Sequence, residues 1–346
     1  MSRRCPTGCG CETVMPTRLL VTGGAGFIGS HYVRTVLGRE SAGAAPGVRV
    51  TVLDKLTYAG NRANLGPVAN DSRLRFVAGD ICDPEVVDRV VRDADEIVHF
   101  AAESHVDRSL VEGDAFVRTN VLGTQVLLDA ALRHGVERFV HVSTDEVYGT
   151  ISEGSWAEGQ PLSPRSPYAA SKAGADLVAL AYHRTHGLDV RVTRCSNNYG
   201  PCQYPEKIVP LFVTRLLSGL TVPLYGDGSQ VREWLHVDDH VGGVELVRTR
   251  GAAGEVYHIG GGAELTNREL TGLLLEACGA GWDRVEQVAD RPGHDQRYAL
   301  DWTKARSLLG YRPRRAFASA LAQTVLWYRD HRAWWDAGAR VANPLQ

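Results

Sequence analysis

The chain has 346 residues and little of what marks a membrane, secreted or nucleic-acid-binding protein. No apolar run approaches the roughly 18 to 20 residues that span a bilayer. Segment 1–17 lacks the apolar stretch of a secretory signal. The formal net charge is only −2, so no overall field attracts nucleic acid or an anionic membrane. We therefore expect a cytoplasmic protein with no nucleic-acid partner and no membrane partner.

Metal sites and disulfides are also not expected. The seven cysteines are odd in number and scattered, which is typical of reduced thiols in a cytoplasm. Three of them fall within segment 1–17, where a fourth ligand is missing, and we interpret this segment as a flexible tail. His236 and His240 have the spacing of metal ligands but lack a third. Cys195 and Cys202 flank one loop and are interpreted as buried bystander thiols rather than a redox pair.

Short apolar runs alternate with segments of helical period through the first half of the chain. The expected strands are residues 18–22, 48–53, 74–77, 96–100, 139–142 and 190–193, and the expected helices are 27–37, 84–93, 114–134 and 168–186. Strands that are apolar throughout are buried on both faces, as in a parallel sheet. Right-handed crossovers then predict an α/β fold with a doubly wound parallel sheet of the Rossmann type over residues 18–195.

The composition of the chain changes after residue 195, where prolines and glycines separate short expected helices and strands. We expect residues 196–335 to form a smaller mixed α/β lobe that closes over the carboxyl ends of the strands, with some interleaving between the two lobes. A helix at 327–335 would pack on that lobe. No repeat and no low-complexity run argues for another architecture.

A glycine-rich turn between the first strand and the first helix predicts a dinucleotide site. Residues 22–29 read TGGAGFIG, which places glycines where the turn is tight and a pyrophosphate must approach the backbone. The following helix offers free N–H groups to the phosphates. Asp54 ends the second strand, where a carboxylate accepts from ribose hydroxyls and repels a 2′-phosphate. This favours NAD over NADP, although Lys55 and Arg62 weaken the preference; a glycine turn without a ligand is the alternative.

Tyr168 and Lys172 suggest the chemistry. They are four residues apart on a predicted helix and therefore share one face. A free tyrosine has a pKa near 10, but a lysine cation and an oxidised nicotinamide both favour its phenolate. Tyr168 can then accept a hydroxyl proton while hydride leaves for the nicotinamide. The alternative is an ordinary pair on the helix surface.

Together, the glycine turn, Asp54, Asp80 and the pair Tyr168/Lys172 resemble the extended short-chain dehydrogenase/reductase family. Four further motifs resemble its nucleoside-diphosphate-glucose 4,6-dehydratases: HFAAESHVDRS (99–109), STDEVYG (143–149), NNYGP (197–201) and PEKIVP (205–210). The likeness runs from about residue 18 to about residue 335. It implies NAD as cofactor, no metal, and a homodimer formed through helices 114–134 and 168–186.

Within this resemblance, Thr144, Asp145 and Glu146 are the discriminating residues. Related sugar 4-epimerases place small hydroxyl residues at this strand end, whereas dehydration needs two acids. A ketone at carbon 4 acidifies the hydrogen on carbon 5; the resemblance implies that Glu146 removes it and that Asp145 protonates the departing 6-hydroxyl. Asp145 should therefore have a pKa raised by burial and by its neighbouring carboxylate. Thr144 would bond the carbon-4 oxygen beside Tyr168. A solvated acidic loop is the alternative.

The resemblance also implies which residues line the site. Arginine suits a diphosphate because its guanidinium is a bidentate fork, and an aromatic ring suits a nucleobase. The expected cofactor-binding residues are Gly23, Gly26, Phe27, Ile28, Gly29, Asp54, Lys55, Leu56, Thr57, Asp80, Ile81, Phe100, Ala101, Ala102, Ser104, Thr119, Tyr168, Lys172 and Asn198. The expected substrate-binding residues are Ser104, Thr144, Asn197, Lys207, Ile208, Pro223, Leu224, Tyr225, Arg232, Asn267, Arg291, His294 and Tyr298.

The sequence thus predicts an NAD-dependent hydro-lyase acting on a nucleotide sugar, with dTDP-glucose as the substrate that the resemblance implies. UDP-glucose remains open, since no residue can be named that reads the nucleotide's methyl group or missing 2′-hydroxyl. A nucleotide-sugar 4-epimerase on the same fold is a second alternative, against which Asp145 and Glu146 argue. A non-catalytic NAD sensor is a third, but Tyr168 and Lys172 are both present.

Overall fold

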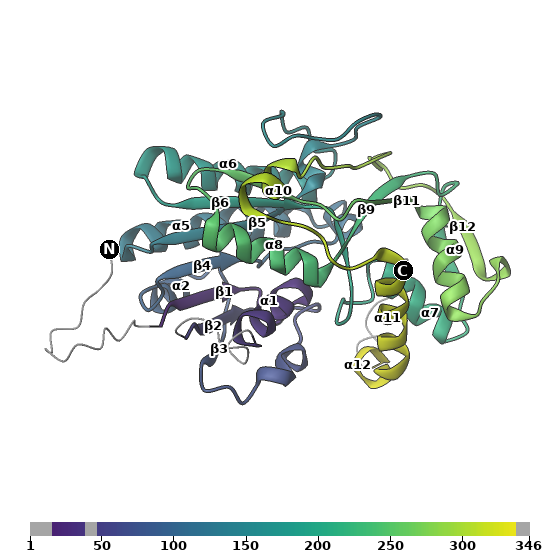
Figure 1. The fold of residues 1–346 in the computed structure, drawn as a ribbon, viewed down its shortest axis with the longest axis horizontal. Coiled ribbons are helices and arrows are strands. Elements are labelled where there is room, and N and C mark those ends of the chain that lie inside the picture. Colours follow the sequence, from purple (N-terminus) through teal and green to yellow (C-terminus); the bar gives the residue numbers. More distant parts are fainter. Residues whose placement is uncertain (1–15, 39–46, 337–346) are drawn as a thin grey trace, which may run out of the picture.

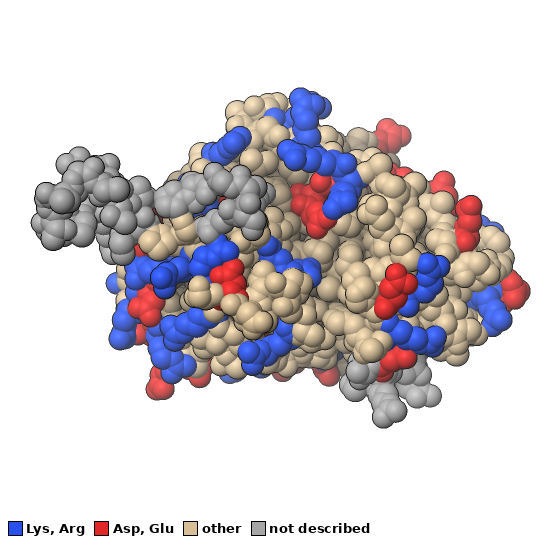
Figure 2. All heavy atoms as spheres, turned by 60° about the horizontal axis from the view of Figure 1, so that its bottom comes forward, with Lys and Arg blue, Asp and Glu red and all other residues tan. Residues whose placement is uncertain are grey.

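A computed structural model describes residues 16–38 and 47–336 of the chain (Figure 1). The three N-terminal cysteines and nearly all of the predicted tail lie outside the described residues. None of the helices in the described ranges is long and apolar enough to cross a bilayer. On the face in Figure 2, basic and acidic side chains are interspersed, in keeping with the small net charge.

The predicted doubly wound sheet is confirmed. It has seven strands in the order β10-β6-β5-β4-β1-β2-β3, and all neighbours are parallel. The strands are β1 (Arg18–Thr22), β2 (Arg49–Asp54), β3 (Leu74–Ala78), β4 (Glu96–His99), β5 (Arg138–Thr144), β6 (Val190–Cys195) and β10 (Val256–Ile259). β1 lies between β4 and β2, so the strand order reverses there and leaves a crevice at the carboxyl ends.

Helices cover both faces of this sheet, and each face has its own apolar core. One core is formed with α1 (Phe27–Gly38), α8 (Val237–Arg250) and α10 (Thr303–Leu309). The other is formed with α2 (Pro84–Val91), α5 (Gly123–His134) and α6 (Pro167–His186). Because β10, α8 and α10 come from the second half of the chain, a boundary at residue 195 separates the two lobes only in part.

The predicted helix over 114–134 is not one regular helix. It consists of α4 (Gly113–Phe116), a wider π-helical stretch (Val117–Leu122) and α5. The stretch presents Asn120 to the segment that follows β4: Asn120 Oδ1 accepts from Glu103 N (2.8 Å) and Nδ2 donates to Glu103 O (3.0 Å). Wide turns of this kind are frequent beside functional sites, and here the turn fixes one wall of the crevice.

The smaller lobe lies beside the carboxyl ends of the large sheet (Figure 1). Its sheets contain β7 (Asn197–Tyr199), β9 (Val231–His236) and β11 (Ala263–Thr266), and β8 (Val222–Tyr225) with β12 (Val285–Val288). Its helices are α7 (Ile208–Leu217), α9 (Asn267–Cys278), α11 (Phe317–Asp330) and α12 (Arg332–Asp336), and a short helix α3 (Val106–Ser109) faces it from the large lobe. The single terminal helix predicted over 327–335 is instead the end of α11 and the short α12, which divide at His331, and Trp335 is buried in this lobe's core.

Candidate active site

One cavity runs along the carboxyl ends of the large sheet and continues between the lobes. It is lined by every residue predicted for catalysis, cofactor and substrate except Leu56. Leu56 has a left-handed backbone (φ +55°) and an exposed side chain, so its predicted cofactor contact is not supported. Instead its backbone N–H donates to Asp54 Oδ1 (2.8 Å).

The glycine turn leaves no room for side chains. Gly23 has φ +69°, and a Cβ there would lie 2.6 Å from the backbone nitrogen of Ala101. A Cβ on Gly29 would lie 2.2 Å from the carbonyl oxygen of Gly23, so α1 packs directly on the turn. The backbone is therefore open to a pyrophosphate at the start of α1, which fits a dinucleotide.

Asp54 supports this turn as well as facing the cavity. Its Oδ2 accepts from Ala25 N (2.9 Å), in the turn itself. The two nearby cations are engaged elsewhere: Lys55 Nζ lies 2.8 Å from Asp80 Oδ2, and the Arg62 guanidinium stacks 4.5 Å from a phenylalanine ring. A 2′-phosphate would thus meet a carboxylate with both cations already paired, which strengthens the preference for NAD.

Tyr168 and Lys172 lie in the first turns of α6. The Ser166 side chain caps the helix by accepting from Ala169 N (3.1 Å), and Pro167 occupies its first position. Lys172 Nζ donates to the carbonyl oxygen of Val142 in β5 (2.7 Å), and burial lowers the pKa of Lys172 to about 8.

The phenol of Tyr168 differs from expectation. Burial raises its pKa well above the usual range, the Glu146 carboxylate raises it further, and a hydrogen bond with Thr144 opposes the rise. Lys172 is not among the main causes of this shift, so the effect expected of Lys172 together with an oxidised nicotinamide stays a prediction.

The two acids sit where β5 ends. Thr144 Oγ1 accepts from Glu146 N (3.3 Å), which caps the short turn Asp145–Tyr148, and lies 3.2 Å from Asp145 Oδ1. Asp145 is 1% exposed, and no described residue hydrogen-bonds its Oδ2. Burial and then the Glu146 carboxylate raise the pKa of Asp145 well above its usual range, as predicted. Burial also raises the pKa of Glu146, while Lys207 and two arginines oppose that rise.

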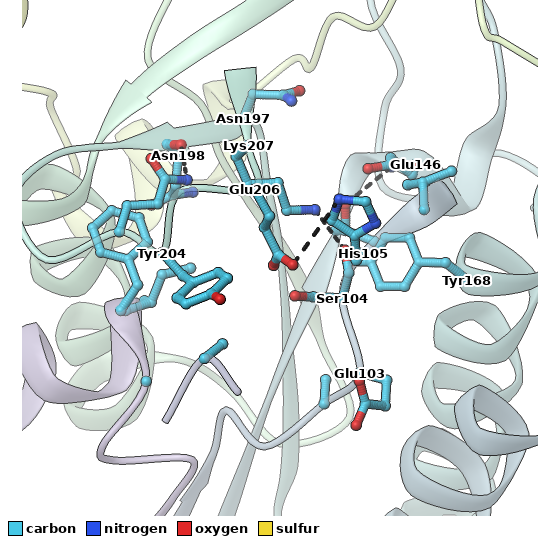
Figure 3. A pocket seen from close by; sticks show the side chains of 18 of the residues that line it. Glu103, Ser104, His105, Glu146, Tyr168, Asn197, Asn198, Tyr204, Glu206 and Lys207 are labelled. Atoms are coloured by element: carbon cyan, nitrogen blue, oxygen red, sulfur yellow. Dashed lines mark hydrogen bonds and ion pairs between the residues drawn. The ribbon is translucent and has the colours of Figure 1, made fainter. Parts of the chain in front are cut away.

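The far end of the cavity is cationic and aromatic. Arg232 is buried, donates from Nη2 to the carbonyl oxygen of Asp295 (2.9 Å), and stacks 4.3 Å from the Tyr298 ring. Lys207 Nζ donates to the carbonyl oxygen of Ser104 (2.6 Å), which ties the two lobes together. Figure 3 shows Lys207, Ser104 and Tyr168 around one space. This end can receive a diphosphate and a nucleobase.

Asn198 contacts His240, one of the two histidines that have the spacing of metal ligands. Its Oδ1 lies 2.9 Å from His240 Nδ1, and its Nδ2 donates to the carbonyl oxygen of Ser196 (2.9 Å). His236 instead caps α8 by accepting from Asp238 N (3.2 Å). No cluster of metal-ligating side chains occurs in the part of the chain that the structure describes. Cys195 and Cys202, which flank the loop that contains Asn198, are both buried free thiols.

Several lining residues were not predicted individually. His105, Asp107 and Glu206 all face the cavity, and His105 Nε2 lies 4.0 Å from Glu206 Oε2 (Figure 3). They fall inside motifs 99–109 and 205–210, so the signal was present. Which positions of each motif point inward depends on the loop conformations, and these follow from packing between the lobes.

Comparison with known proteins agrees with this geometry. The family model described as GDP-mannose 4,6 dehydratase matches residues 20–324. A protein named dTDP-glucose 4,6-dehydratase from Streptomyces antibioticus is 70% identical over 318 residues, covering 92% of this chain and 94% of that protein. Another of that name, from Streptomyces niveus, is 62% identical and covers 92% of this chain and 95% of its own.

Solved structures are similar throughout the fold. The dTDP-glucose 4,6-dehydratase of Streptomyces venezuelae, crystallised with NAD and a second molecule, has a TM-score of 0.91 and 64% identity, covering 93% of this chain and all of its own (100%). A UDP-glucose 4-epimerase of Thermus thermophilus in complex with NAD has a TM-score of 0.83 and 34% identity, covering 91% and 100%. The chain therefore belongs to the GDP-mannose 4,6 dehydratase family, within the extended short-chain dehydrogenases/reductases.

Proposed function

We infer that the chain is an NAD-dependent dTDP-glucose 4,6-dehydratase, which converts dTDP-glucose to dTDP-4-keto-6-deoxyglucose and water. The observation that carries this function is the pair of the buried Asp145 and the half-buried Glu146, which faces the same cavity as Tyr168 and Lys172. Its product is an intermediate for making deoxysugars.

The residues at the glycine turn fit NAD, since backbone is open at Gly23 and Asp54 faces the ribose position. NAD held there would supply the hydride acceptor for oxidation at carbon 4 and the hydride donor for reduction at carbon 6. We propose that Tyr168 accepts the 4-hydroxyl proton at its phenolic oxygen. Thr144, which lines the same cavity, then orients the carbon-4 oxygen. Lys172 holds a buried positive charge beside β5 that favours the phenolate once the proton moves.

Elimination of water falls to the two acids. Glu146 would accept the carbon-5 proton, and the cations Lys207, Arg291 and Arg232 favour its ionised form. Asp145 keeps its proton because it is buried, and its Oδ2, with no partner among the described residues, can donate to the departing 6-hydroxyl. The environments thus separate a base from an acid at adjacent positions.

Incubation with dTDP-glucose and UDP-glucose side by side tests this function. We expect mass spectrometry to show loss of one water from dTDP-glucose without net accumulation of reduced nicotinamide, because the cycle is redox-neutral. Faster turnover of UDP-glucose than of dTDP-glucose would show that UDP-glucose is the preferred substrate. Conversion to an isomer of unchanged mass would instead identify a 4-epimerase and contradict the inference.

We propose that the chain acts in the cytoplasm as a homodimer formed through α4, α5 and α6. Exposed apolar side chains support this face: Val117 is 55% exposed, Leu122 42% and Leu177 56%. The π-helical stretch and α6 pack against each other, so these side chains belong to one pair of neighbouring elements. Such apolar exposure favours burial in an interface.

Leu177→Glu is expected to convert the dimer to a monomer, because the interface would have to bury an unpaired charge. Light scattering coupled to gel filtration should show the mass halved. Leu308→Glu, at a residue 66% exposed in α10, is the matched control and should remain dimeric. A monomeric unaltered chain would refute the proposed assembly.

A further inference from the structure

The smaller lobe contacts the large lobe through the segment that follows β4. Lys207 Nζ bonds the carbonyl oxygen of Ser104 (2.6 Å), and three residues along, Asp107 makes two side-chain contacts with the smaller lobe. Asp107 lies in the one-turn helix α3 and lines the cavity. It has no role in the chemistry proposed above.

Asp107 binds two residues of the nucleotide end at once. Its Oδ1 accepts from Arg291 Nη1 (3.1 Å), and its Oδ2 accepts from the Tyr225 hydroxyl (3.2 Å). Arg291 lies in the loop after β12 and Tyr225 ends β8, so one carboxylate from the large lobe joins two elements of the smaller lobe. The side chains are half-buried (21% exposed for Arg291, 32% for Asp107), which limits screening by solvent.

This contact orients Arg291 without using up its donors. A guanidinium carries five N–H donors in a planar fork, and Asp107 engages the Nη1 end. Arg291 Nε is buried and has no hydrogen-bond partner among the described residues. Donors therefore remain for a second anion such as a diphosphate. A carboxylate that blocked the site would instead accept hydrogen bonds from both sides of the guanidinium and leave no donor free.

Charge gives a second reason for Asp107. Arg232 and Arg291 line the same cavity, and repulsion from Arg291 adds to burial in lowering the pKa of Arg232. Asp107 supplies a negative charge on the side of Arg291, which allows both cations to face one cavity. Without Asp107, repulsion between the two cations would favour movement of the Arg291 side chain away from Arg232 and into solvent.

We propose that Asp107 is a positioning residue of the nucleotide site, which holds Arg291 and Tyr225 in the orientation that receives the diphosphate and the base. The inference rests on the proposed function, because it assigns those two side chains to the nucleotide half of dTDP-glucose. Asp107 acts through Arg291 and Tyr225 and does not itself touch the reacting sugar carbons.

Asp107→Asn tests the proposal, since it keeps the size of the side chain and removes its charge. We expect the Kd for dTDP, measured by calorimetry, and the KM for dTDP-glucose both to rise about tenfold, because a charge-assisted bond becomes a neutral one. We expect kcat to change less than about twofold, since binding and not the chemical step is affected. Glu112→Gln, which removes the same charge from an exposed pair with Arg108, is the matched control and should leave Kd unchanged.

Double variants separate positioning from a general loss of structure. Asp107→Asn should add little to the defect of Arg291→Gln if both act through one contact. Tyr225→Phe should give a smaller rise in Kd, because it removes one bond and no charge. Additive effects, or an unchanged or lower Kd in Asp107→Asn, would overturn the positioning role. If the unaltered chain bound no dTDP and turned over no dTDP-glucose, the proposed function would fail instead.

Discussion

Tyr168→Phe is expected to lower the rate at which dTDP-glucose reduces the bound nicotinamide by about 10²- to 10⁴-fold. The variant keeps the ring, which packs against Phe116 at 6.3 Å, and loses only the oxygen that would accept the 4-hydroxyl proton. Stopped-flow absorbance of reduced nicotinamide in a single turnover measures this step directly. The melting temperature should change little.

Tyr182→Phe is the matched control for this substitution. Tyr182 lies on the same helix, and its hydroxyl donates to Asp129, away from the cavity. It should keep the full rate of nicotinamide reduction. Reduction at the normal rate in Tyr168→Phe would refute the role of Tyr168 as proton acceptor, and equal losses in both variants would point to damage of α6.

Glu146→Gln should separate oxidation from elimination. The 4-hydroxyl would still be oxidised, because Tyr168 and Thr144 are intact. Exchange of the carbon-5 hydrogen with solvent should fall by about 10²- to 10⁴-fold, since an amide cannot accept that proton. Reduced nicotinamide should then accumulate with substrate bound, while release of the 4-keto-6-deoxy product is lost.

Mass spectrometry of the substrate pool and product after incubation in deuterium oxide measures this exchange. Glu153→Gln is a suitable control, because Glu153 is exposed and lies outside the cavity. It should incorporate solvent deuterium as the unaltered chain does. Undiminished incorporation in Glu146→Gln would show that another group is the base, and loss of nicotinamide reduction in that variant would indicate a misplaced sugar.

Six strands of the large sheet were predictable because each contains a short apolar run, although the edge strand β3 is only partly buried. The seventh, β10, is a four-residue run among glycines, and only its pairing with β6 shows that it completes the sheet. The π-helical stretch was not predictable either, since Asn120 has no local signal for its bonds to Glu103.

The site residues can also be separated into those that the sequence indicated and those that it did not. The glycine turn, Asp54 and the pair Tyr168/Lys172 were expected from residue types at fixed spacing, because the turn, the strand end and the helix face are local structures. The two acids were expected from the resemblance to the family. The cofactor contact of Leu56 stays a prediction, because whether its side chain reaches the cofactor depends on a left-handed backbone.

By itself, the sequence determined the fold class and indicated the cofactor turn, since short-range sterics and apolar periodicity act within a few residues. Only the tertiary structure decided that burial raises the pKa of Tyr168. It also decided that Asp107 meets Arg291 across 184 positions of the chain. Desolvation and long-range ion pairs depend on how complete elements pack, and that packing is a property of the whole chain.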